Sequence, residues 1–162
     1  MARARFVETL RLLAAADVEF IVVGMTAGVL QGAPVTTLDL DVLHRRTPEN
    51  VARLLKALRE LRAVYRGDPR RLSPTESHLA GPGHQLLETA NGDLDCLGSI
   101  GDGQSYEELL GSTVDIVLSG GLHIRVLDLP TLIELKTRAG RPKDLAAIPH
   151  LEATLKEQEK IR

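Results

Sequence analysis

Aromatic residues and cysteines are scarce in this chain, and each shortage excludes a class of protein. There is no Trp, and there are only two Phe and two Tyr. The core therefore has to be aliphatic, and a single-strand nucleic-acid surface built from stacked aromatic rings is nearly excluded. The single cysteine, Cys96, cannot form an internal disulfide, which fits a reducing compartment.

Long hydrophobic runs and an excess of one charge are also missing. No apolar run approaches the length of a membrane span, and the basic start leads into an amphipathic stretch without a cleavable hydrophobic segment. These absences predict a cytoplasmic protein with no membrane contact. Twenty Lys and Arg against 22 Asp and Glu give a net charge of −2, so any contact with nucleic acid has to come from a local patch.

The apolar residues that are present suffice for one domain. With 162 residues, 43% of them hydrophobic, the chain can bury a core of ordinary size, and we expect residues 1–162 to form a single domain. The patterns predict helices over 3–16, 25–32, 48–61, 129–139 and 143–160, and strands over 19–24, 35–43, 84–90, 93–97, 113–118 and 123–127. This order predicts an α/β (α+β) fold in which helices pack on a mixed β-sheet and two helices end the chain.

Asp39 and Asp41 lie one residue apart in the predicted strand over 35–43. Alternate residues of a strand share a face, so the two carboxylates would lie close together and repel each other. Mg²⁺ (or Mn²⁺) would relieve that repulsion, because such a hard cation takes one or two carboxylates and completes its shell with water and phosphate oxygens. The alternative is an inert pair on a solvated strand face, and so short a motif does not exclude it.

The segment before this pair is typical of a phosphate site. The strand over 19–24 ends in Gly24 and opens directly into a short helix that begins at Met25 and Thr26. Such a junction points backbone N–H groups and the positive end of the helix dipole at an anion, and glycine lets a phosphate approach the backbone. A phosphate cradle beside a pair of carboxylates is what a metal–triphosphate site requires.

In their order, these motifs resemble those of the nucleotidyltransferase superfamily, specifically small bacterial members related to AbiEii-type toxins. The family pattern is a strand ending in Gly-Gly or Gly-Ser, a short helix, Asp-x-Asp, and a third carboxylate on a later strand. The matching segments here are Gly24-Met25-Thr26, Asp39-Leu40-Asp41 and Asp93-Leu94-Asp95. We prefer Asp95 as the third carboxylate, because Asp93 follows the Asn91-Gly92 turn; a turn Asp and an edge-strand Asp without function remain the alternative.

A second resemblance lies near the C-terminus. The family's Lys, followed by Arg-x-Lys-Asp, is matched by Lys136, Arg141, Lys143 and Asp144. Lys136 falls on the apolar stripe of the helix over 129–139, where a lysine must extend to solvent or meet an anion. The resemblance favours triphosphate contact for Lys136, Arg141 and Lys143 and an active-site place for Asp144, whose alternative role is a favourable charge at a helix N-terminus.

The resemblance implies a metal-dependent enzyme that moves a nucleotidyl group from a nucleoside triphosphate to an acceptor hydroxyl on a tRNA, a protein or a small molecule. Asp39, Asp41 and Asp95 would hold the Mg²⁺ (or Mn²⁺), with Asp95 at a second ion. An antitoxin protein is a further implied partner. Met25, where the family has Gly or Ser, and Val35, where relatives often have Arg, favour the alternative of a degenerate member that binds a nucleotide or a protein without turnover.

A basic run crosses the start of residues 66–84, a segment rich in Gly, Pro and charge that we expect to be a loop. The run consists of Arg62, Arg66, Arg70 and Arg71. Such runs are more often solvated helix ends than guides for tRNA or triphosphate, and we interpret this one in the same way.

Overall fold

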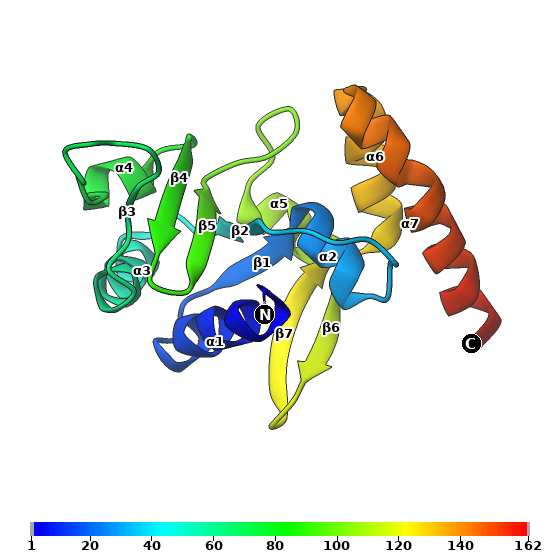
Figure 1. Ribbon diagram of the computed structural model, residues 1–162, viewed down its shortest axis with the longest axis horizontal. Helices are drawn as coiled ribbons and strands as arrows, with labels where there is room; N and C mark the ends of the chain where they lie inside the picture. Colours follow the sequence, from blue (N-terminus) through cyan, green and yellow to red (C-terminus); the bar gives the residue numbers. More distant parts are fainter. Residues whose placement is uncertain (1, 162) are drawn as a thin grey trace.

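In the part of the chain that the structure describes, seven strands form one mixed sheet (Figure 1). The computed structural model describes residues 2–161, with side chains from Arg5 onward. In chain order the strands are β1 (Phe20–Val23), β2 (Leu40–His44), β3 (Val64–Tyr65), β4 (His84–Thr89), β5 (Gly92–Leu97), β6 (Thr113–Leu118) and β7 (Leu122–Leu127). In space they follow the order β3-β4-β5-β2-β1-β7-β6. β1 runs parallel to β7 and β2 parallel to β5, and the remaining neighbours are antiparallel, which confirms the predicted mixed sheet.

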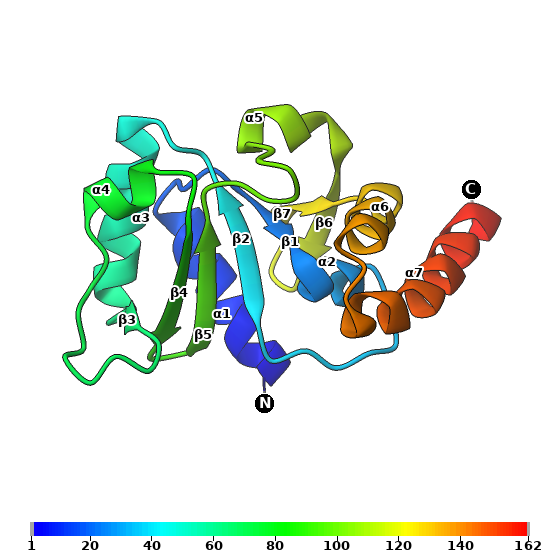
Figure 2. The same cartoon turned by 90° about the horizontal axis from the view of Figure 1, so that it is seen from above.

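Helices pack on the sheet and at both ends of the molecule. They are α1 (Ala2–Ala15), α2 (Gly24–Leu30), α3 (Pro48–Glu60), α4 (Glu76–Ala80), α5 (Tyr106–Leu109), α6 (Leu129–Ala139) and α7 (Pro142–Ile161), with a 3₁₀ turn at Leu110–Ser112. α1 packs against β5 and β7, and α2 contacts α6. Figures 1 and 2 both show the α6–α7 pair at one end and the α3–α4 pair at the other. Over residues 2–161, no helix combines the length and the apolarity needed to cross a membrane.

Local sequence signals set the ends of two helices. The hydroxyl of Thr47 accepts a backbone N–H of the first turn of α3, and Pro48 follows as the first helical residue. Asp128 caps α6 in the same way, and Gly140 ends that helix in the left-handed conformation, with φ 64°. All of these boundaries were predicted from the sequence and are confirmed.

Two predicted segments differ from the structure. The strand predicted over 35–43 begins only at Leu40, where β2 starts to pair with Leu94 of β5; β1 ends at Val23, opposite Asp41, and residues 35–39 pair with neither strand. Asp39 therefore precedes the strand, and strand alternation does not fix its direction. The loop predicted over 66–84 also contains α4, whose first turn is closed by reciprocal hydrogen bonds between Thr75 and His78.

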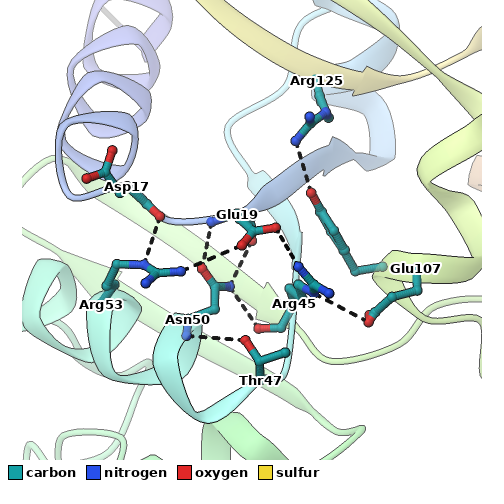
Figure 3. A network of polar contacts seen from close by, with 9 residues as sticks. Asp17, Glu19, Arg45, Thr47, Asn50, Arg53, Glu107 and Arg125 are labelled. Atoms are coloured by element: carbon teal, nitrogen blue, oxygen red, sulfur yellow. Dashed lines mark hydrogen bonds and ion pairs between the residues drawn. The ribbon is translucent and has the colours of Figure 1, made fainter.

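A buried amide ties the start of β1 to the end of β2 and to α3 (Figure 3). Asn50 is fully buried; its Oδ1 accepts the Glu19 N–H at 2.7 Å, and its Nδ2 donates to the carbonyls of Glu19 at 2.9 Å and Arg45 at 2.8 Å. The Arg45 guanidinium also pairs with the Glu19 carboxylate at 3.0 Å. Because both polar atoms of the Asn50 side chain have partners, this amide stabilises the fold and is not available to a ligand.

Candidate active site

Strand pairing brings two of the predicted site carboxylates together. Asp41 on β2 and Asp95 on β5 are direct neighbours in the parallel register. Residues paired in this way leave the sheet on the same face, and the preceding pair, Leu40 and Leu94, is buried on the other face. Two motifs far apart in the sequence therefore form one carboxylate cluster on one face of the sheet.

The chain's own charges compensate Asp41 only in part. Burial, followed by the negative charges of Asp95 and Asp39, raises the pKa of Asp41 from 3.8 to about 7, and Lys136 opposes this only in part. One carboxylate oxygen, Asp41 Oδ1, is buried and has no hydrogen-bond partner among the described residues. An ionised carboxylate in this position is costly unless a cation joins it, so the site fits a hard divalent ion.

Gly24 lies directly against this carboxylate. A Cβ atom on Gly24 would collide with Asp41 Oδ2, and the residue adopts a φ of +65°, which only glycine accepts readily. α2 begins at Gly24, and the residue before it, Val23, offers no side-chain cap to the first N–H groups of the helix. The predicted phosphate cradle and the predicted metal ligand are thus in contact.

The next two residues of the cradle have different environments. Thr26 is buried, and its hydroxyl donates to the Asp39 carbonyl at 2.5 Å. This hydrogen bond holds the segment that carries Asp39, so the hydroxyl is committed to the fold and the backbone N–H is what Thr26 can offer to a phosphate. Met25 is partly buried and packs on the core.

Asp95 carries an ion pair that sequence reasoning missed. Arg66, directly after β3, places its Nη2 at 2.5 Å from Asp95 Oδ1 and its Nε at 3.2 Å from Asp93 Oδ2. The interpretation of the basic run as a solvated helix end is therefore wrong for Arg66, while the side chains of Arg70 and Arg71 are 75% and 70% exposed. β3 spans two residues, which is too short for any periodicity to place Arg66 on a sheet face.

The described residues contain no group of three or more His, Cys, Asp or Glu side chains that could hold a metal ion. Two features explain this for the predicted set. Asp39 precedes β2 instead of lying in it, and Asp95 already has Arg66 as its partner. What the donor set fits is a hard cation held by one or two carboxylates and completed by phosphate oxygens and water.

A second charged cluster lies on the two C-terminal helices. The Asp144 carboxylate is fully buried; Lys136 Nζ lies 3.1 Å from its Oδ1, and Arg141 Nε lies 2.6 Å from its Oδ2. The hydrogen bond from Arg141, and then Lys136, lower the pKa of Asp144 from 3.8 to about 2. Asp144 therefore orients Lys136 and Arg141, and its own oxygens are taken up by them.

One cavity of about 190 Å³ joins the two clusters. Its polar lining includes Gly24, Asp41, Lys136, Arg141 and Asp144. Lys143 is exposed on α7 and is not part of this lining. A larger cavity of about 450 Å³, between α1, α2 and residues 32–37, has no ionisable side chain in its lining. The smaller cavity is lined by residues of both charged clusters, which makes it the candidate site for a charged substrate.

Comparison with known proteins identifies the fold. No protein-family model matches the chain, and no curated protein sequence does so either. The structure is similar to that of a Thermotoga maritima protein provisionally described as a nucleotidyltransferase, with a TM-score of 0.59 and 20% identity over 100% of this chain and 97% of that one. It is also similar to the antibiotic-resistance factor ANT(2'')-Ia, an aminoglycoside nucleotidyltransferase, with a TM-score of 0.62 and 14% identity over 96% of this chain and 86% of that one.

These similarities confirm the predicted nucleotidyltransferase fold. At such low identities they bear on the fold alone. The narrower resemblance to AbiEii-type toxins remains a prediction, as do the roles of the individual site residues.

Proposed function

Starting from the nucleotidyltransferase fold, we propose that this protein binds a nucleoside triphosphate with a divalent metal ion and transfers its nucleotidyl group to an acceptor hydroxyl. One observation carries the proposal: Asp41 is a partly buried carboxylate whose charge Lys136 compensates only in part, it contacts Gly24, and it lines the same cavity as Lys136. A metal–triphosphate complex supplies both the cation that Asp41 lacks and the anion that Lys136 can meet.

In this proposal Asp39 and Asp41 hold Mg²⁺ (or Mn²⁺), with Asp95 beside them as the third carboxylate. The ion, when bound, neutralises charge on the triphosphate and polarises the phosphorus that is attacked. Gly24, Met25 and Thr26 bind the phosphates through backbone N–H groups. The Thr26 hydroxyl keeps the Asp39 segment in place through its hydrogen bond to the Asp39 carbonyl.

Lys136 and Arg141 form the opposite wall of the proposed site, and Asp144 holds both of them. They neutralise charge as the acceptor hydroxyl releases its proton to solvent, its oxygen forms a bond to phosphorus and the bond to the leaving pyrophosphate breaks. The exposed Lys143 attracts the triphosphate from outside the cavity. The acceptor hydroxyl belongs to a tRNA, a protein or a small molecule in a cytoplasmic setting, and an antitoxin protein is the proposed regulatory partner.

A binding module without turnover is the second candidate function. Two observations favour it: Met25 packs on the core where the family has a small or hydroxyl residue, and Asp95 is paired with Arg66. Such a protein would bind the metal–triphosphate complex and release no pyrophosphate with any acceptor.

Isothermal titration of each nucleoside triphosphate with Mg²⁺ tests the proposed site. We expect metal-dependent binding to the wild type and its loss in an Asp39→Ala, Asp41→Ala double variant. Asp115→Ala is the matched control, because Asp115 lies on β6 and its side chain is 57% exposed. Failure of every triphosphate to bind the wild type would contradict the proposal. Pyrophosphate release then separates the enzyme from the binding module.

A further inference from the structure

Arg66 is fixed at the carboxylate cluster by its backbone and by its side chain. Its backbone N–H donates to the Leu86 carbonyl at 3.0 Å, which places the residue beside β4. Its Nη2 reaches across that strand, donates to the Leu87 carbonyl at 2.9 Å, and pairs with Asp95 on β5 at 2.5 Å. The side chain is 30% exposed. A guanidinium held by two acceptors is a built part of the site.

The position of this guanidinium matters because of what lies next to it. Asp95 is the register partner of Asp41, and its side chain is 14% exposed. Of these two adjacent carboxylates, Asp95 therefore has a permanent cation in an ion pair, whereas the charge of Asp41 is compensated only in part, by Lys136. Arginine keeps its charge at any pH at which proteins function, so this compensation does not vary.

We propose that Arg66 takes the place of a second divalent ion at Asp95, so that the site binds one divalent ion with the triphosphate and not two. The inference rests on the proposed function and deepens it. A divalent ion on Asp95 Oδ1 would have to displace the guanidinium or accept a like charge at close range, and both are unfavourable. Asp39 and Asp41 hold the single ion, because Arg66 acts on Asp39 only through its charge and no ion pair to either aspartate is formed among the described residues.

This assignment replaces the expectation that Asp95 helps to bind a second ion. It also gives Arg66 the role of a positioning residue, since it fixes the Asp95 carboxylate and sets how many ions the cluster accepts. The absence of a three-carboxylate cluster among the described side chains agrees with a site for one ion.

The number of bound ions tests the inference without any need for turnover. Mn²⁺ is counted by electron paramagnetic resonance and by calorimetry, in the presence of a non-hydrolysable triphosphate analogue. We expect one Mn²⁺ per wild-type chain, two in Arg66→Gln and Arg66→Met, and one in Arg66→Lys, which keeps the charge. Arg71→Gln is the matched control, because this nearby arginine is 70% exposed and lies against Glu88, at 3.7 Å; it should bind one.

The possible results separate this inference from the proposed function. Two ions in the wild type would overturn the inference and leave the function standing, as would a single ion in both neutral variants when their circular dichroism matches that of the wild type. No bound Mn²⁺ in the wild type would overturn the proposed function and the inference together.

Discussion

Two aspartates line the cavity, Asp41 on β2 and Asp144 on α7, and they differ in whether the chain pairs them with cationic side chains. On α7, Asp144 is fully buried and paired with Lys136 and Arg141, and its pKa is lowered to about 2. On the sheet, Asp41 is partly buried beside other carboxylates, and its pKa is raised to about 7. A carboxylate that the chain itself compensates supports the structure, whereas one that it leaves without a cation is kept available for a ligand.

The largest expected change in the free energy of unfolding follows from removal of the Asp144 carboxylate, which is paired with Lys136 and Arg141. Asp144→Ala leaves Lys136, whose side chain is 16% exposed, without its partner. We expect a loss of about 3 kcal/mol in the free energy of unfolding, measured by urea titration. Glu157→Ala is the control, because its pair with Lys160 is 69–71% exposed, and it should cost less than about 1 kcal/mol. Equal losses in the two variants would contradict the structural role of Asp144.

A smaller loss of unfolding free energy is expected from a substitution at Gly24, where the backbone contacts Asp41. Gly24 and Gly67 both have positive φ, +65° and +74°, but only at Gly24 does an added Cβ meet a neighbour, Asp41. Gly67→Ala should cost roughly 1 kcal/mol through the backbone alone. Gly24→Ala should cost at least about 1 kcal/mol more and weaken triphosphate binding. Similar unfolding free energies for the two variants would show that the close contact with Asp41 does not exist.

Removal of the negative charge of Asp41 should increase the free energy of unfolding of the protein. Because the folded-state pKa of Asp41 lies above its ordinary value, the folded protein holds a proton between about pH 4 and pH 7 that the unfolded chain releases, and stability falls as the pH rises through that window. Asp41→Asn should remove this fall and be about 1–3 kcal/mol more stable than the wild type at pH 8 with chelator present. Asp115→Asn should leave the fall intact. A variant less stable than the wild type at pH 8 would contradict the assignment.

The smallest change in unfolding free energy is expected for a surface ion pair that lies outside the cavity lining. Glu134 and Arg138 form an exposed pair one turn apart on α6, at 2.6 Å. Glu134→Gln should change the free energy of unfolding by less than about 0.5 kcal/mol and leave triphosphate affinity unchanged. A larger change would show that surface charge, and not compensation within the cavity, dominates the electrostatics of this protein.

The features that depend on neighbouring residues in the sequence were predicted correctly. The helix caps at Thr47 and Asp128 depend on hydrogen bonds within one turn, and both were predicted correctly. The strand that carries Asp95 was also placed almost correctly, because the Asn91-Gly92 turn marks its start. Motif order then predicted the nucleotidyltransferase fold before any comparison.

The strand boundaries and ion pairs that depend on distant parts of the chain were not predicted. The start of β2 depends on its pairing with two distant strands, β1 and β5, so Asp39 was placed inside a strand that does not include it. The ion pair of Arg66 with Asp95 spans three strands, and no spacing within the sequence announces it. Lys136 was predicted on an apolar stripe, but its partner Asp144 comes from the next helix.

The difference between Asp41 and Asp144 can be measured directly by following their side-chain carboxyl resonances in one NMR pH titration. We expect a pKa of about 7 for Asp41 and about 2 for Asp144 without metal. Addition of Mg²⁺ and a nucleoside triphosphate should lower the pKa of Asp41 and leave that of Asp144 unchanged. An Asp41 pKa near its ordinary 3.8, unaffected by the metal–triphosphate complex, would contradict the central claim that this carboxylate is kept for a cation.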